Sequence, residues 1–198
     1  MSRITTRRGA LGLVGLTGLA LAGCGTSGSE DLAEQARSGE DKGYVSGTGV
    51  ITQLSDAERG DPLDLDFTLL SGESASLAQW RPRIVVINLW YAACPPCRVE
   101  APDLNATYEE LGDQVEFLGV NVRDQAGTAE SFVRRFEVPY PVMLDSDGSM
   151  VSLLSGVLPP QATPSTVVLD ATGRAAARVV GAVTRSTLTG LVEDALAE

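Results

Sequence analysis

The stretch of residues 85–100, VVINLWYAACPPCRVE, constrains the fold of this chain more than any other part of the sequence. The apolar run of residues 84–89 is rich in β-branched side chains, as is typical of a buried strand. Two cysteines, Cys94 and Cys97, follow this run and enclose two prolines. Proline fits the first turn of a helix, because the N–H groups there have no partner within the helix. The stretch therefore predicts a strand, a sharp turn and a helix that begins at Cys94.

The spacing of the two cysteines indicates thiol–disulfide chemistry. At the N-terminus of a helix, the unpaired N–H groups and the positive end of the helix dipole favour a thiolate, so Cys94 is the predicted nucleophile. Cys97 lies one turn later on the same face, where it can close a small disulfide loop and resolve a mixed disulfide. This two-electron reaction requires no cofactor. Pro95 and Pro96 have no N–H to donate to the Cys94 sulfur, which favours a reductant over an oxidant.

Other uses of the cysteine pair fit the sequence less well. A structural zinc site needs four ligands, and this chain has no histidine and only three cysteines, so two chains would have to share the ion. A purely structural disulfide across so short a loop removes little chain entropy. A thiol peroxidase would have Pro and Thr or Ser seven and three residues before its reactive cysteine. Before Cys94 these positions hold Ile87 and Tyr91, and before Cys97 they hold Trp90 and Cys94, so the pattern is absent.

The first residues of the chain have the layout of a secretory signal peptide. Three arginines precede the apolar run of residues 10–22, which is too short to span a bilayer. The run ends in LAGC at Cys24, which resembles the lipobox of bacterial lipoproteins. We therefore expect residues 1–23 to be a lipoprotein signal peptide and Cys24 to carry the lipid. An ordinary cleaved signal is the alternative, and the TRR sequence leaves open whether export is general or twin-arginine.

Residues 24–60 contain few large apolar side chains and predict a lipidated flexible tether, although residues 45–54 are apolar enough to pack on a domain. Residues 61–198 form the predicted folded domain. Without the three arginines of the signal peptide, 12 basic residues face 26 acidic ones, a formal charge of −14. This charge disfavours nucleic acid and anionic lipid surfaces as partners.

Predicted strands and helices alternate through the domain. The predicted strands are residues 65–70, 84–89, 115–122, 142–144, 166–169 and 174–180. The predicted helices are residues 76–80, 94–110 with an interruption at Pro102, 128–136, 148–154 and 186–197, the last with Ser186 as its N-cap. Strands that alternate with helices and end in a hairpin indicate an α/β fold, with a central mixed β-sheet flanked by helices.

Two further features belong with the cysteines. The Thr163–Pro164 bond precedes a predicted strand, and in the cis form it would place exposed backbone beside the dithiol; an ordinary loop proline is the alternative. Glu100 lies one turn beyond Cys97, where an inward-pointing carboxylate can handle protons for the thiol. A solvated helix glutamate is the alternative.

Together, Asn88-Leu89-Trp90, the CPPC motif, Glu100, Ala101-Pro102 and Thr163-Pro164 resemble the TlpA/ResA-type family of extracytoplasmic thioredoxin-like proteins. The resemblance covers roughly residues 61–196 and implies a thioredoxin-like fold with an N-terminal β extension. It implies that Cys94 attacks and Cys97 resolves. It also implies that substrate docks against a cis Pro164, with Thr163 and Trp90 beside it, and that Glu100 is the acidic residue kept beside the dithiol.

The sequence departs from this family at the rim of the site. Ala93 stands where the family usually has a bulky residue, and Tyr91 is atypical, so the surface that meets the substrate differs. The resemblance implies a lipid-anchored disulfide reductase of exported proteins outside the cell membrane. Apocytochrome c as substrate and a membrane thiol donor of the CcdA type follow from kinship alone. An oxidase or isomerase, a thiol peroxidase, and a binding lipoprotein with vestigial cysteines are the alternatives.

Overall fold

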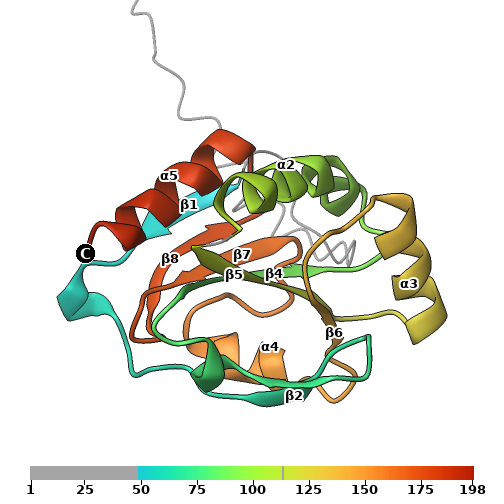
Figure 1. Cartoon of the computed structure of the whole chain (residues 1–198), viewed down its shortest axis with the longest axis horizontal. Coiled ribbons are helices and arrows are strands. Elements are labelled where there is room, and N and C mark those ends of the chain that lie inside the picture. Colours follow the sequence, from blue (N-terminus) through green and yellow to red (C-terminus); the bar gives the residue numbers. More distant parts are fainter. Residues whose placement is uncertain (1–48, 113) are drawn as a thin grey trace, which may run out of the picture. The chain divides into compact units, whose positions relative to one another are not determined.

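The computed structural model describes residues 49–112 and 114–198 (Figure 1). A six-stranded sheet with the order β1-β8-β7-β4-β5-β6 runs through this part of the chain. Its strands are β1 (Val50–Gln53), β4 (Ile84–Trp90), β5 (Val115–Asn121), β6 (Val142–Leu144), β7 (Ser165–Leu169) and β8 (Ala175–Val180). Strands β4, β5 and β6 are parallel, whereas β7, β8 and β1 each pair antiparallel with their neighbours. The sheet is therefore mixed, which confirms the predicted fold class.

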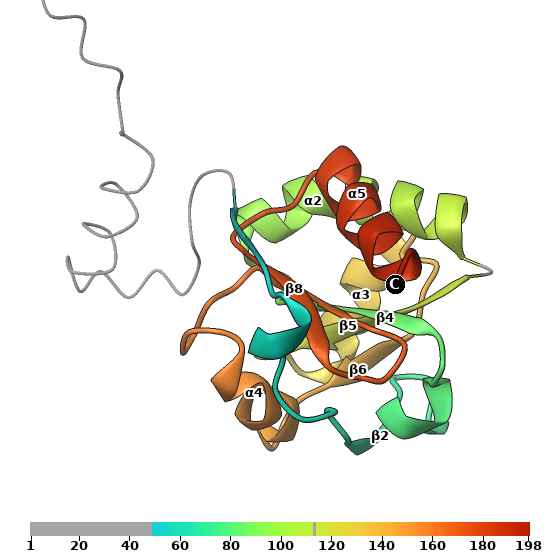
Figure 2. The ribbon, with the colours of Figure 1, turned by 90° about the vertical axis from the view of Figure 1, so that its left-hand side faces the viewer.

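Helices cover the sheet on both sides. They are α2 (Pro95–Leu111), α3 (Ala126–Arg135), α4 (Ser149–Leu153) and α5 (Arg185–Leu196), with 3-10 turns η1 (Asp56–Glu58), η2 (Leu77–Trp80) and η3 (Leu154–Gly156). Figure 2 shows α2 and α5 over one face, and α4 over the other together with the hairpin of β2 (Asp66–Thr68) and β3 (Ser74–Ser76). Within the described residues, no helix is long and apolar enough to cross a bilayer.

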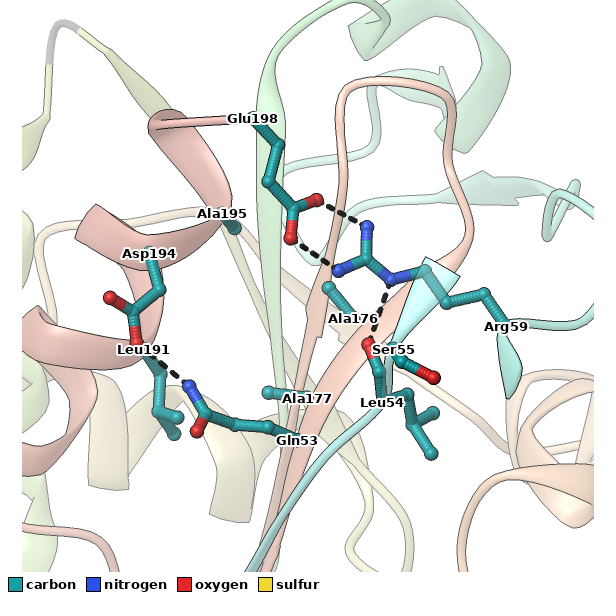
Figure 3. Close-up of a pocket in the computed structure, with 10 residues that line it drawn as sticks. All are labelled: Gln53, Leu54, Ser55, Arg59, Ala176, Ala177, Leu191, Asp194, Ala195 and Glu198. Atoms are coloured by element: carbon teal, nitrogen blue, oxygen red, sulfur yellow. Dashed lines mark hydrogen bonds and ion pairs between the residues drawn. The ribbon is translucent and has the colours of Figure 1, made fainter. Parts of the chain in front are cut away.

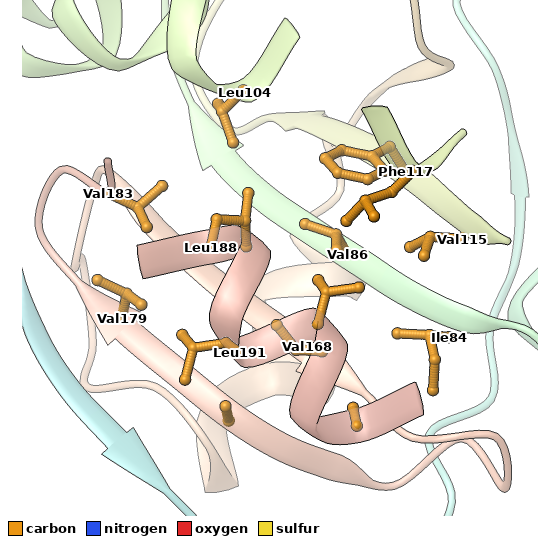
Figure 4. Packing of buried hydrophobic residues seen from close by; sticks show 14 of the residues in the cluster. Ile84, Val86, Leu104, Val115, Phe117, Val168, Val179, Val183, Leu188 and Leu191 are labelled. Carbon is orange, nitrogen blue, oxygen red and sulfur yellow. The ribbon is translucent and has the colours of Figure 1, made fainter. Parts of the chain in front are cut away.

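Strand β4 is buried along its whole length because both of its faces are covered. Ile84 and Val86 point toward α2 and α5, where Leu104 and Leu188 pack on them (Figure 4). The alternate side chains face the other layer and pack against a second cluster that includes Phe67, Leu77, Met150 and Leu154. A strand with two apolar faces reads as a continuous hydrophobic run, which is how this strand could be predicted.

Residues 50–60 belong to the folded domain, so the predicted tether is wrong over residues 55–60. The packing that the sequence left open for residues 45–54 is found from residue 50 onward. Strand β1 pairs with β8, and the N–H of Leu54 donates to the carbonyl of Ala176. Arg59 then pairs with Glu198 near the end of α5 (Figure 3). It also pairs with buried Asp170. An exposed edge strand needs few large apolar side chains, so this segment looks like a tether in the sequence. The remaining tether, the signal peptide and Cys24 lie outside the described residues.

Three local predictions need correction. Pro102 does not interrupt α2, which runs continuously from Pro95 to Leu111. Thr184, and not Ser186, is the N-cap of α5, because its hydroxyl accepts the N–H of Thr187. Strand β3 was not predicted, since its residues are small and polar and pair only with the short β2.

Candidate active site

The cysteine pair lies where β4 ends and α2 begins. Cys94 is the N-cap of α2, and its sulfur is bonded to that of Cys97, with 5.3 Å between the two Cα atoms. The backbone N–H of Cys97 donates to the Cys94 sulfur at 3.2 Å. Both cysteines are buried, whereas Ala93 and Pro95 on either side of Cys94 are exposed. The helix end is thus directed at the sulfur that we expect to be the nucleophile.

Glu100 points into the protein, so the alternative of a solvated helix glutamate is wrong. Its side chain is only 1% exposed. One carboxyl oxygen accepts from the Asn88 side-chain amide at 2.9 Å, and the other from the backbone N–H of Val183 at 3.0 Å. Burial raises the pKa of Glu100 to about 8, although these two hydrogen bonds act in the opposite direction. The carboxyl group therefore exchanges its proton near neutral pH, as a proton handler should.

A small cavity joins this polar cluster to the second cysteine. It has a volume of about 10 Å³, which is room for about one water molecule. Asn88, Cys97, Trp90 and Tyr140 are among the residues around it. Because Asn88 also donates to Glu100, the space beside Cys97 is one hydrogen bond away from the buried carboxyl group.

The Thr163–Pro164 peptide bond is cis, and it lies at the same edge of the sheet as the cysteines. Ser165, the next residue, pairs with Leu89 near the carboxyl end of β4. Thr163 and Pro164 are both buried. Their predicted role in docking substrate stays a prediction.

Trp90, which we expected to contact substrate, is turned inward. It is 4% exposed and stacks on Phe132 of α3, with ring centres 4.3 Å apart. A side chain packed between β4 and α3 supports the site from behind. This packing role is therefore clear, whereas the predicted contact of Trp90 with substrate stays a prediction.

Four polar side chains that the sequence reasoning missed fix the loop before Cys94. The N–H of Ala92 donates to the Asp124 carboxylate at 2.6 Å, and its carbonyl accepts from the Arg98 guanidinium at 2.8 Å. Asn121 donates to Asp124 at 2.8 Å, and the Arg123 guanidinium lies 4.2 Å above the ring centre of Tyr91. The NVRD sequence of residues 121–124, at the end of β5, is typical of a turn that its own side chains stabilise. The contact of this turn with Ala92 could not be predicted, because the two lie 32 residues apart in the sequence.

Metal chemistry finds no support in this part of the chain. Across residues 49–112 and 114–198, no group of three His, Cys, Asp or Glu side chains is arranged to hold a metal ion. The sulfur pair and the buried carboxyl group are reactive groups of the described site. Two cysteine sulfurs suffice for a two-electron exchange.

Comparison with known proteins agrees with this chemistry. The model of the AhpC/TSA family matches residues 60–178. The thiol-disulfide oxidoreductase ResA of Geobacillus thermodenitrificans is 32% identical over 123 residues, which are 61% of this chain and 68% of ResA. The thiol:disulfide interchange protein HelX of Rhodobacter capsulatus is 32% identical over 115 residues, 58% of this chain and 62% of HelX.

The fold also matches a solved structure. A secreted thiol-disulfide isomerase of Corynebacterium glutamicum is 30% identical, with a TM-score of 0.69, and the match covers 75% of this chain and 92% of that protein. The dithiol at the end of β4, the mixed sheet and these relatives agree with one another. This chain therefore belongs to the AhpC/TSA family and is a thiol–disulfide oxidoreductase of the ResA/TlpA type.

Proposed function

We propose that this oxidoreductase reduces disulfides of exported proteins outside the cytoplasmic membrane. The observation that carries the direction is the hydrogen bonding of the Cys94 sulfur. Pro95 and Pro96 have no N–H, so Cys97 supplies the first backbone donor of α2 to this sulfur. A thiolate with few donors is stabilised little, and the reduced dithiol then gives up its electrons readily.

The reaction runs in two exchanges. The Cys94 thiolate attacks one sulfur of the partner's disulfide, forms a mixed disulfide and releases the partner's other sulfur as a thiolate. Cys97 then attacks the Cys94 sulfur, closes the Cys94–Cys97 disulfide and releases the second partner thiol. The protein loses two electrons, the partner gains them, and the proton of Cys97 passes to the released sulfur or is held by Glu100.

The reduction potential tests the direction. The full chain carrying Cys24→Ser, in which Cys94 and Cys97 are the remaining thiols, is equilibrated in glutathione or dithiothreitol buffers and assayed by alkylation. We expect a value near the roughly −270 mV of thioredoxin. A value near the roughly −120 mV of DsbA would refute the reductase and favour an oxidase or isomerase. Isomerase is the activity named for the C. glutamicum relative.

We further propose that residues 1–23 are a lipoprotein signal and that Cys24 carries the membrane anchor. The apolar run that ends in LAGC supports this, as does the relative described as secreted. In membrane and soluble fractions of cells, the wild-type chain should sediment with membranes. A Cys24→Ser variant should be lost from them, and equal membrane association of the two would refute the anchor.

The proposed partners are exported proteins such as apocytochrome c, with a CcdA-type membrane thiol protein as electron donor. Both come from the family resemblance. A Cys97→Ala variant retains the attacking thiol and cannot resolve the mixed disulfide, so it should accumulate partners that reducing agent releases. Recovery of apocytochrome c and of a membrane thiol protein would support the assignment. Unchanged levels of c-type cytochromes in cells without this protein would refute apocytochrome c as a partner.

A further inference from the structure

Two arginines beside the dithiol lack the carboxylate partner that most arginines have in the described part of this acidic chain, whose formal charge is −11. Six arginines of the described domain pair with carboxylates: Arg59, Arg81, Arg83, Arg134, Arg174 and Arg185. Within the same part of the chain, Arg98 and Arg123 form no ion pair, and both are exposed. Their charges are therefore available to a partner.

Both guanidinium groups are held at the loop that leads into Cys94. Arg98 donates through Nε to the carbonyl of Ala92 at 2.8 Å, which leaves the outer nitrogens of its guanidinium for other acceptors. The Arg123 guanidinium lies 4.2 Å above the centre of the Tyr91 ring. Side chains that are already fixed lose little conformational freedom when a partner binds. The two cations thus form a prepared surface next to the nucleophile.

Asp124, which follows Arg123 in the sequence, uses its carboxylate within the loop. The Asp124 carboxylate accepts the N–H of Ala92 at 2.6 Å and the side-chain amide of Asn121 at 2.8 Å. The side-chain oxygen of Asn121 accepts in turn from the backbone N–H groups of Arg123 and Asp124. This half-buried carboxylate fixes the loop, and it forms no ion pair with the exposed Arg98 or Arg123.

We propose that Arg98 and Arg123 select partners that carry an acidic side chain beside the cysteine attacked by Cys94. Guanidinium groups bind carboxylates through paired, charge-assisted hydrogen bonds. The inference rests on the proposed exchange reaction and adds to it a chemical class of substrate: a disulfide-bonded segment with Asp or Glu next to the target cysteine. Attraction of this kind acts on the encounter rate and weakens in salt.

Two matched peptides test the preference. Each contains one disulfide, and they differ only in a Glu or a Gln next to the target cysteine. The rate constant for reduction by the reduced full chain is divided by that for dithiothreitol, which corrects for intrinsic reactivity. At low ionic strength we expect the Glu peptide to react about three- to tenfold faster than the Gln peptide, and high salt to bring the ratio close to one.

Arginine variants identify the source of the preference. Arg98→Gln and Arg123→Gln should each lower the Glu/Gln ratio, whereas Arg98→Lys should retain part of it. Arg135→Gln is the matched control, because Arg135 is also exposed and forms no ion pair in the described domain, yet lies at the far end of α3 from the loop. The control should retain the ratio. A merely structural effect of a variant would slow both peptides equally and leave their ratio unchanged.

The outcomes separate the two proposals. Equal rates for the two peptides, or a ratio that survives both Arg98→Gln and Arg123→Gln, would overturn the acidic preference and leave the exchange reaction intact. Failure to reduce either peptide would overturn the exchange reaction together with the preference.

Discussion

Glu100 should make the stability of this protein fall as the pH rises. Burial places its pKa at about 8 in the folded protein, against an ordinary value of 4.5. Below the ordinary value the carboxyl group is protonated in both states, and its contribution to stability is fully present. As the pH rises, the unfolded chain ionises first, so the free energy of unfolding decreases until the folded group ionises as well.

The size of this loss follows from the two pKa values. Each pH unit between them costs up to about 1.4 kcal/mol, because the folded carboxyl group keeps a proton that the unfolded one has lost. From pH 5 to pH 8, with partial ionisation near each pKa taken into account, the Glu100 contribution amounts to about 3 kcal/mol. Glu100→Gln does not titrate and should lack this part of the pH dependence.

Urea unfolding of the oxidised protein measures the difference, since no active-site thiol titrates while the Cys94–Cys97 disulfide is intact. The glutamine amide would turn a donor toward either Asn88 or Val183, at a cost of about 1–3 kcal/mol at every pH. The readout is therefore the change with pH and not the stability itself. Glu109→Gln, at an exposed position of α2, is the control and should follow the wild type.

Parallel plots of the free energy of unfolding against pH for the wild type and Glu100→Gln would refute this reasoning. The Glu100 carboxyl group would then titrate alike in the folded and the unfolded protein. Should the glutamine variant fail to fold, the carboxyl carbon of Glu100 in the wild type still reports the titration by NMR. A midpoint near pH 8 is expected. A midpoint near pH 4.5 would show that burial does not control this group.

Three further substitutions test the support of the site, each by urea unfolding. Asp124→Ala removes the acceptor of the buried Ala92 N–H and should cost about 1–3 kcal/mol; a smaller loss would mean that water replaces the carboxylate. Gly119→Ala would place a Cβ 3.1 Å from the Trp90 indole nitrogen and should cost about 1–3 kcal/mol by overpacking. Gly127→Ala, with open space in α3, should instead stabilise by up to about 1 kcal/mol, so a loss there would contradict the packing argument.

The parts of the fold that could be predicted are those that local sequence determines. The central strand β4 is buried on both faces, so six of its seven residues are apolar, and this run can be recognised without knowledge of its partners. Strands β1 and β3 could not be found in this way. Strand β3 has three small residues, and β1 has four, of which Val50 and Ile51 are exposed. Strand β1 forms because β8, more than a hundred residues later, presents its edge to it.

In the candidate site, too, local features could be predicted and long-range contacts could not. The cysteine pair lies within one helical turn, so its disulfide chemistry could be read from spacing alone. The inward position of Glu100 depends on donors from Asn88 and Val183, which lie 12 and 83 residues away in sequence. The contact of Asp124 with Ala92 spans 32 residues. Long-range hydrogen bonds of this kind leave no periodic or compositional trace in a single sequence.

The charges around the dithiol give the two sulfurs different environments. On the side of Cys94 lie the N-terminus of α2 and the exposed guanidinium of Arg98, both of which stabilise negative charge. On the side of Cys97 lie Asn88 and, one hydrogen bond further, the buried Glu100, where burial penalises negative charge. The first thiolate of the reduced protein should therefore form at Cys94. Cys97 should keep its proton until it attacks the Cys94 sulfur of the mixed disulfide, because only the thiolate can make this attack.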